Sequence, residues 1–408
     1  MKRGYQRRAI VLPAALLLLA TPIAGAQRVT PADILQRDIL ERAILQRYPW
    51  LFCPNSLTQD FPTSGTAQTT WRICWREVAG SNSLVNPNGL VIGPAYFRKS
   101  PNAPFVRVLW DMRVSDYFVP YHPGSPRYYD LSSFNFQLTW VTVADCPAGV
   151  GGKVLSEHVC KEVHDRGLMW KTYSSVRRGE ELVLWGAIDA ANYRYIQEYT
   201  FRDDGTIIGR MGATGRNLPY SELIPHVHNA LWRIDIDLGG YTNSAARSQH
   251  IEDPTNSAGT ASDVTSPISG AQGFTWGVRT HDAIEITNAS LTNALGHVSA
   301  YRLGPLVTGG GLTQHYEAFT RNDFWVTPYN LAQFAASDLN TYVAGQLSVV
   351  NRNIVLWYKG SLHHHPRDED GVYNPNPYWI GTADVMWTGF MLMPRNLFDC
   401  SPFYQPCP

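Results

Sequence analysis

Histidines occur at two places in the chain where their spacing could bring imidazoles onto one metal ion. The first is Pro225-His226-Val227-His228, and side chains two residues apart in a strand project from the same face. Imidazoles suit copper or zinc, although such a pair is also common among solvated or core histidines. The pair therefore indicates a candidate metal site and leaves a structural role open.

The second place is the run His363, His364 and His365, which follows the strand-like segment 354–358. Consecutive side chains alternate between the two faces of an extended chain, so either His364 alone or the pair His363 and His365 can face a shared site. An exposed polar loop is the alternative, because loops normally lie at the surface. The six cysteines show no CxxC spacing, so thiolates are not expected to bind metal.

Strands are the elements expected to position these residues. The 33 glycines and 27 prolines indicate many turns, and the strand-like segments are rich in β-branched and aromatic residues. We therefore predict an all-β fold, a large antiparallel β-sandwich, with a loop over 249–273 where Ser, Thr, Gly and Asp cluster. The clearest strand-like segments are 106–110, 136–143, 181–185 and 193–201.

The beginning of the chain is typical of an exported protein. Its first residues are basic, an apolar run follows, and Ala24-Gly25-Ala26 closes that run, as in a cleavable secretory signal. An uncleaved membrane anchor is the alternative. Thr30 and Pro31 can then start a helix. We predict a secreted or periplasmic protein with a signal peptide at 1–26, an N-terminal helix and cysteine-bearing lead-in segment at 27–88, and the β-sandwich at 89–408.

The cysteine count and the charge balance narrow the class of protein further. An even number of cysteines in an exported chain favours three disulfides, although sequence alone leaves their pairing open. The net charge is +0 with scattered Lys and Arg, which argues against a nucleic-acid partner. The cysteines form three neighbouring couples, which are Cys53 with Cys74, Cys146 with Cys160, and Cys400 with Cys407.

Several segments, in one order along the chain, resemble the catalytic domain of the copper amine oxidases. That family oxidises primary amines with copper(II) and a topaquinone made from a tyrosine. Asn192-Tyr193 matches its cofactor motif, with Tyr193 as the topaquinone precursor and Asn192 as the residue that orients the ring. His226 and His228 match its H-x-H copper pair, and His364 matches the third copper ligand in its H-x-P-R-x-E-D motif.

An upstream segment resembles the part of the family that carries the catalytic base. The resemblance implies that Asp130 is this base, that Tyr128 stands at the gate position and that Tyr121 hydrogen-bonds the quinone oxygen. Family members usually have a longer loop between these two tyrosines. Cys146 and Cys160 match the family's internal disulfide.

Residues after the H-x-H pair resemble the family's peripheral calcium site. Asp235, Ile236 and Asp237 would supply two carboxylates and a backbone carbonyl, which are suitable ligands for calcium. A later family aspartate appears here as Asn353, beside Ile354, and this removes one charge. A solvated strand end is the alternative interpretation of the two aspartates.

Two residues beside Tyr193 depart from the family pattern. Arg194 replaces an acidic residue, and Asp189 stands where Ser or Thr is expected. A basic residue thus replaces an acidic one beside the tyrosine. Because that phenol must be oxidised near a metal cation, the change is not conservative. We predict that Asp189 and Arg194 pair with each other.

The resemblance implies oxidative deamination of primary amines to aldehyde, ammonia and hydrogen peroxide, with dioxygen as the oxidant. It also implies a homodimer, by family analogy alone. One alternative is a copper-binding protein that never forms the quinone, either a non-catalytic copper holder or a partner subunit. Another is a β-sandwich binding module, which explains the composition but not the ordered motifs.

Overall fold

The computed structural model of the chain describes most of one compact unit that spans residues 49–408. The predicted signal peptide and N-terminal helix lie outside the described residues, and the domain boundaries at residues 26 and 88 stay predictions. None of the described helices is long and apolar enough to cross a bilayer. The described residues are 53, 55–78, 89–121, 127–215, 224–241, 244–252, 262–276, 283–306, 317–330, 332–367 and 385–402.

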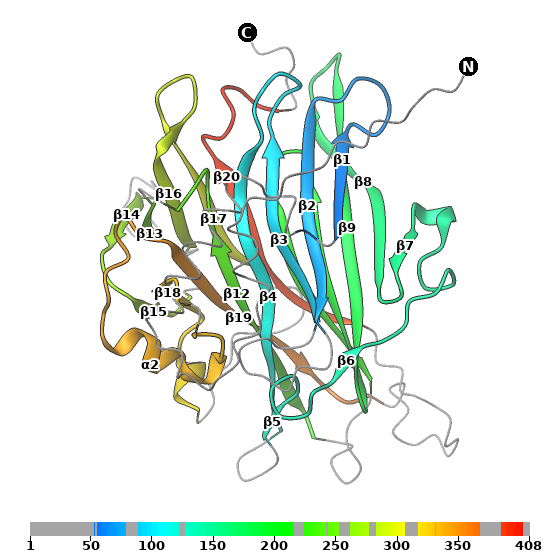
Figure 1. Cartoon of the computed structure of the whole chain (residues 1–408), viewed down its shortest axis with the longest axis vertical. Helices are drawn as coiled ribbons and strands as arrows, with labels where there is room; N and C mark the ends of the chain where they lie inside the picture. The colour runs from blue at the N-terminus through cyan, green and yellow to red at the C-terminus, as the bar shows by residue number, and fades with distance from the viewer. Residues whose placement is uncertain are drawn as a thin grey trace, which may run out of the picture. The chain divides into compact units, whose positions relative to one another are not determined.

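The described strands form two antiparallel sheets, which confirms the predicted all-β sandwich (Figure 1). The first sheet has the order β1-β2-β3-β4-β12-β19-β18-β15, and β5 pairs with β4. Its strands are β1 (Asn55–Phe61), β2 (Thr69–Val78), β3 (Gly89–Arg98), β4 (Val106–Pro120), β5 (Arg127–Tyr129), β12 (His226–Ile236), β15 (Gln272–Phe274), β18 (Phe324–Pro328) and β19 (Ile354–His364).

The second sheet has the order β14-β13-β16-β17-β20-β11-β10-β9-β8-β7, and β6 pairs with β9. Its strands are β6 (Gln137–Leu138), β7 (Lys153–Ser156), β8 (Val159–Lys171), β9 (Val176–Ala190), β10 (Tyr193–Arg202), β11 (Ile207–Gly215), β13 (Ser244–Glu252), β14 (Ser262–Ile268), β16 (Ala283–Thr292), β17 (Val298–Leu306) and β20 (Met386–Arg395). The described helical elements are η3 (Ala148–Val150), η4 (Ala318–Arg321), η5 (Ala336–Asp338) and α2 (Leu339–Ala344).

The prediction of a loop over 249–273 is wrong for most of the described part of that segment. The end of β13, all of β14 and part of β15 lie in this segment. β14 is the edge strand of its sheet, and residues 264–267 are exposed. Polar side chains are well tolerated on an edge strand because it faces water and avoids pairing with other chains. The polar composition of this edge strand therefore led to the prediction of a loop.

The strand β12 is buried along its whole length because both of its faces are covered. Ala230, Trp232 and Ile234 point into the core between the sheets, whereas Leu231 belongs to a second apolar cluster that includes Leu339 of α2. Strand alternation explains this division, since successive side chains point to opposite faces. Residues at the beginning of β12 are thus held in the interior of the sandwich.

The turn-rich segment before residue 89 contributes two strands to the first sheet. β1 pairs with β2, and β2 pairs with β3, so the lead-in segment extends the sandwich. A disulfide joins Cys53 to Cys74, one of the neighbouring couples whose pairing the sequence left open. Cys407, which forms the third neighbouring couple with Cys400, lies outside the described residues.

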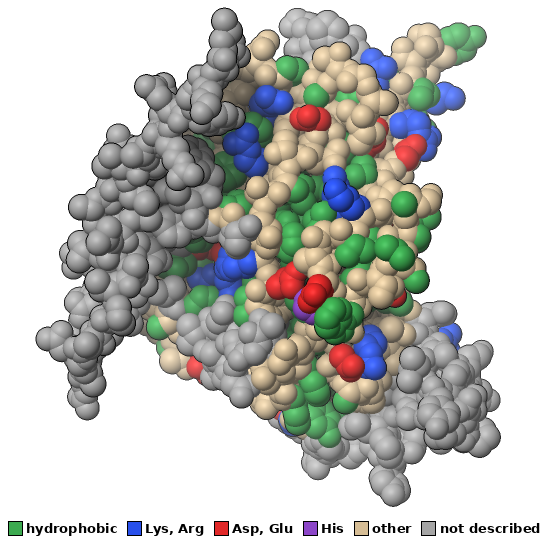
Figure 2. Space-filling view, turned by 45° about the vertical axis from the view of Figure 1, so that its right-hand side comes forward, with side chains coloured by type: hydrophobic (Ala, Val, Ile, Leu, Met, Phe, Trp, Pro, Cys, Tyr) green, Lys and Arg blue, Asp and Glu red, His purple; other side chains and the backbone are tan. Residues whose placement is uncertain are grey.

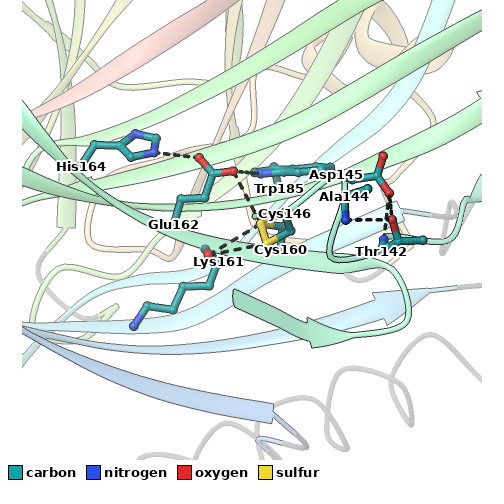
Figure 3. Close-up of a disulfide and its surroundings, with 9 residues drawn as sticks. All are labelled: Thr142, Ala144, Asp145, Cys146, Cys160, Lys161, Glu162, His164 and Trp185. Atoms are coloured by element: carbon teal, nitrogen blue, oxygen red, sulfur yellow. Dashed lines mark hydrogen bonds and ion pairs between the residues drawn. A yellow bond between two sulfur atoms is a disulfide. The ribbon is translucent and has the colours of Figure 1, made fainter. Parts of the chain in front are cut away.

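The predicted disulfide between Cys146 and Cys160 is also confirmed, and it ties the segment before β7 to β8 (Figure 3). Beside it, the Glu162 carboxylate accepts a hydrogen bond of 2.8 Å from Trp185 Nε1 and lies 2.7 Å from His164 Nε2. Covalent closure and these polar contacts fix the edge of the second sheet.

Acidic and basic side chains are interspersed on the molecular face drawn in Figure 2.

Candidate metal centre and active site

Three histidines that are distant in the sequence converge inside the sandwich. β12 and β19 are antiparallel neighbours, and their register places His226 directly opposite His364. His228 projects from the same face of β12, and the ligand atoms of all three side chains lie within 4.8 Å of one another. All three side chains are buried. The structure thus brings together the three residues predicted to bind metal.

The histidine run begins at the end of β19, and its side chains lie in two different places. His364 joins the buried cluster, whereas His363 and His365 pack against each other with ring centroids 3.8 Å apart. This is the alternation expected of an extended chain. Of the two arrangements that the sequence left open, the structure has His364 alone at the shared site.

The hydrogen bonds of His226 and His228 leave Nε2 of each ring as the nitrogen whose lone pair can bind a metal. His226 Nδ1 lies 3.2 Å from the Ile224 carbonyl, which can only accept, so Nδ1 carries the proton. His228 Nδ1 lies 3.0 Å from the Tyr195 hydroxyl, whose own proton goes to a carboxylate. The two Nε2 atoms then face each other at 2.9 Å with lone pairs. Such an arrangement is favourable when a cation lies between them.

The protonation states of these histidines also fit a metal ligand set. Burial lowers the pKa of His226 to about 3 and holds the pKa of His228 well below its usual value. Both side chains are therefore neutral imidazoles at physiological pH, and metal ligands must be deprotonated. Three imidazole nitrogen donors with no thiolate fit copper(II) or zinc.

Tyr193 brings a phenol to this cluster from the opposite sheet. Its hydroxyl oxygen lies 3.2 Å from His226 Nε2 and makes a shorter contact with His364 Nδ1. Tyr193 is the first residue of β10, directly after a tight turn that includes Asn192 and left-handed Ala191 (φ 60°). Residues other than glycine rarely adopt this conformation, and those that do often lie at a functional site.

Tyr195 connects the histidines to the predicted base, a role that sequence reasoning missed. Its hydroxyl donates a hydrogen bond of 2.8 Å to Asp130 Oδ2 and lies 3.0 Å from His228 Nδ1. The Tyr195 and Tyr193 rings are nearly parallel, at 8° and 6.1 Å between centroids. Their i, i+2 spacing on a strand was the available signal, because it places both rings on one face.

Asp130 is a buried carboxyl whose pKa is raised to about 7. Burial is the main cause, and the nearby Asp116 carboxylate adds to it, whereas the hydrogen bond from Tyr195 opposes both. Asp116 also fixes the segment that carries Asp130, because it accepts hydrogen bonds from Leu131 N at 3.0 Å and from Ser132 Oγ at 2.5 Å. Sequence reasoning gave Asp116 no role.

A cavity of about 270 Å³ opens beside this cluster. Tyr193 and Asp130 line it, so a small molecule there can contact both the phenol and the carboxyl. The Tyr121 ring also stacks on His226, at 4.2 Å and 14°. The structure therefore places all five residues predicted to act in catalysis around one space. The described lining residues are Val119, Tyr121, Tyr128, Asp130, Phe134, Phe136, Ala190, Ala191, Asn192, Tyr193 and Tyr195.

The two residues that depart from the family pattern form an ion pair, as predicted. Arg194 Nη1 lies 2.9 Å from Asp189 Oδ1, and the residues are cross-strand partners on β10 and β9. The same nitrogen also donates to the carbonyls of Ala191 and Tyr193. The guanidinium is thus held against the turn by carboxylate and backbone oxygens.

Charge reversal should test this pairing. We expect Arg194→Glu to lower the free energy of unfolding by at most about 1 kcal/mol, because it replaces a partly exposed attraction by a like-charge repulsion. Adding Asp189→Arg to the same chain should restore part of that loss. Urea denaturation of the single and double variants measures both changes, and equal stability of the Arg194→Glu chain and the double variant would contradict the pairing.

The residues of the predicted calcium site lie where β12 ends and β19 begins. Asp235 and Asp237 are fully buried, and Asp237 Oδ2 pairs with Arg107 Nη2 at 2.6 Å. The register places Ile236 opposite Ile354, so Asn353 lies next to this end of β12. The arginine already balances one carboxylate, and calcium binding stays a prediction.

Comparisons with known proteins agree with this geometry. Residues 224–406 match the family model of the copper amine oxidase enzyme domain. The chain is 25% identical over 398 residues to an Arabidopsis thaliana protein named amine oxidase [copper-containing] alpha 2, peroxisomal, covering 78% of this chain and 57% of that protein. It is 24% identical over 384 residues to primary amine oxidase 2 of the same plant, covering 77% of this chain and 55% of that protein. The chain therefore spans a little over half the length of these relatives.

The comparison with solved structures shows a similar fold. The crystal structure of a copper-containing benzylamine oxidase from Hansenula polymorpha aligns with a TM-score of 0.60 at 18% identity, covering 83% of this chain and 61% of that chain. The resemblance predicted from the sequence is confirmed. His226, His228 and His364 lie inside the range of the family model, whereas Asp130 and Tyr193 precede it.

Proposed function

Because the chain is related to the copper amine oxidases in sequence and in fold, we propose that it oxidises primary amines to aldehydes, with release of ammonia and hydrogen peroxide. The observation that carries the proposal is the position of the Tyr193 hydroxyl, 3.2 Å from His226 Nε2 at the edge of the buried histidine cluster. A carboxyl of raised pKa lines the same cavity as this phenol. A protein that only stored copper would need neither group.

In this proposal, His226, His228 and His364 hold copper(II), and Tyr193 is the precursor of topaquinone. Bound copper supplies redox chemistry with dioxygen, and the quinone supplies an electrophilic carbonyl for the amine. The protein contributes orientation. Asn192 would hold the modified ring, Tyr121 would hydrogen-bond its oxygen, and the other side chains of the cavity would exclude water.

Asp130 acts as the general base in this mechanism. Its carboxylate removes a proton from the substrate carbon that bears the nitrogen, and a base works best when its pKa lies near the working pH. The raised pKa of about 7 suits that task. Tyr195 orients the carboxylate through the hydrogen bond to Oδ2. Tyr128 stands on the wall of the cavity and serves as the gate.

The pH dependence of turnover should follow the ionisation of Asp130. Only the ionised carboxylate accepts a proton, and its pKa is raised to about 7, so the active fraction falls as the pH falls below 7. We expect kcat/KM to decrease about tenfold per pH unit well below pH 7. Steady-state assays between pH 5 and pH 9 measure the profile, and a flat profile through pH 6 would contradict the assignment.

Two variants should move this profile in opposite directions. Tyr195→Phe removes a hydrogen bond that lowers the pKa of Asp130, so we expect a shift of roughly one unit to higher pH. Asp116→Asn removes a negative charge that raises this pKa, so we expect a shift to lower pH. The same assays on both variants check these signs. If both variants moved the pH profile in the same direction, Asp130 would not be the group that sets it.

A coupled assay tests the proposed activity itself. The chain is loaded with copper in air and mixed with benzylamine, and hydrogen peroxide and benzaldehyde are measured. We expect both products in equal amounts, and none from His228→Ala, which removes one copper ligand. Full copper binding without either product would instead favour the non-catalytic copper holder.

Export to an oxidising compartment, a homodimer and calcium binding complete the proposal. The two described disulfide pairs are compatible with export, because disulfides persist in oxidising compartments. The homodimer rests on family analogy. Calcium binding rests on the position of Asp235, Asp237 and Asn353.

A further inference from the structure

One wall of the cavity consists of aromatic rings, and the proposed mechanism gives two of them, Phe134 and Phe136, no task. The Phe134 and Phe136 rings are stacked, with centroids 5.6 Å apart and an angle of 13° between their planes. Tyr128 packs beside Phe134 with centroids 5.6 Å apart. All three rings line the cavity. Phe134 is 48% exposed, which leaves much of this wall open to a ligand.

The backbone presents this wall to the cavity in a fixed way. Asn135, between the two phenylalanines, has a φ of 55°, a left-handed conformation that asparagine adopts more readily than most residues. The segment is anchored just upstream, where Asp116 accepts hydrogen bonds from Leu131 N and Ser132 Oγ. The aromatic wall and the Asp130 carboxyl therefore belong to one short, anchored segment.

The charge distribution of the cavity limits what the far end of a substrate can be. Asp130 is the only acidic residue among the described residues that line the cavity, and none of these is Lys, Arg or His. A second ammonium, as in a diamine, would lose hydration against the aromatic wall without a second carboxylate to pair with it. An aryl ring would instead gain apolar burial and ring stacking.

The volume agrees with a substrate of one ring. At about 270 Å³, the cavity lies just below the range of roughly 300–1,000 Å³ that is typical of ligand pockets. We propose that Phe134 and Phe136 select arylalkyl monoamines by stacking on the aryl ring while the amine reaches the side of the cavity that holds Asp130 and Tyr193. This inference rests on the proposed amine oxidation and names the substrate class of that site.

Substrate comparison on matched variants tests the inference. For the wild-type chain we expect kcat/KM for 2-phenylethylamine to exceed the value for butylamine and for 1,4-diaminobutane by at least about tenfold. Phe136→Ala and Phe134→Ala should each reduce this preference about tenfold, mainly through a higher KM for 2-phenylethylamine. Tyr173→Ala removes a fully exposed ring outside the cavity and should leave the preference unchanged. Preference for the diamine, or equal losses for all three amines, would overturn the inference.

A binding measurement separates this inference from the proposed activity. Tyr193→Phe lacks the quinone precursor, so calorimetry on this chain reports binding without turnover. We expect 2-phenylethylamine to bind about tenfold more tightly than butylamine, and the difference to disappear when Phe136→Ala is added. Equal affinities would overturn the inference. If the wild-type chain oxidises no amine, the proposed activity fails, and this calorimetric ranking still decides the aromatic preference.

Discussion

A Tyr193→Phe variant is expected to bind copper and to show no measurable amine oxidation. The substitution removes only the hydroxyl that lies 3.2 Å from His226 Nε2, so the three imidazoles stay in place while the proposed quinone precursor is lost. Because the proposed chemistry depends wholly on the modified ring, the loss should be complete, in contrast to the partial losses of positioning variants. Copper content by metal analysis and hydrogen peroxide release measure the two effects.

Tyr199→Phe provides a matched control for this variant. Tyr199 lies on the same strand, is equally buried, and donates its hydroxyl proton to the Leu90 carbonyl, away from the described cavity lining. Its removal should cost about 1 kcal/mol of stability and leave turnover unchanged. Residual activity of Tyr193→Phe above the metal-free background would show that another group performs the reaction.

An Asp130→Asn variant is expected to keep the quinone and to lose turnover by about 10²–10⁴-fold. Asparagine has nearly the same shape and can still contact Tyr195, but it cannot accept a proton at neutral pH. The chain should therefore react with phenylhydrazine as completely as the wild type while its kcat falls. Phenylhydrazine titration and steady-state kinetics separate the two properties.

The opposite pattern would contradict the role of Asp130. A variant with normal turnover per quinone but little quinone would place Asp130 in cofactor formation. A loss smaller than about tenfold in kcat would indicate that another base removes the proton. The raised pKa of this carboxyl, about 7, is the property that the substitution removes.

The fold class was predictable because strand alternation leaves a local signal. The segments 106–110, 181–185 and 193–201 were predicted as strands, and they lie inside β4, β9 and β10. The strand predicted over 136–143 is mostly wrong, because only the two residues of β6 within it are a strand. The strands within 249–273 were missed because an edge strand such as β14 is exposed and polar, and its composition matches that of a loop.

The candidate metal centre was predictable only in part. The H-x-H spacing alone placed His226 and His228 on one face, whereas the third histidine depended on the resemblance. The pairing of β12 with β19 sets His226 opposite His364, and sequence alone does not give the register of strands so far apart in the chain.

Tyr195 and Asp116 were missed for a different reason. Each acts through other side chains or backbone groups. A tyrosine or a single aspartate within a strand-like segment carries no signal of such a role by itself. Tyr195 gains significance only when β10 faces Asp130 across the sandwich. Asp116 gains it only when its carboxylate meets Leu131 N and Ser132 Oγ.

Mass analysis of the peptide that contains Tyr193 tests the central claim most directly. The chain from residue 27 onward is purified without metal, supplied with copper in air, and digested before and after reaction with phenylhydrazine. The predicted result is a gain of two oxygen atoms and a loss of two hydrogen atoms at Tyr193, in a peptide that phenylhydrazine then labels. An unmodified Tyr193 in a fully copper-loaded chain would contradict the claim.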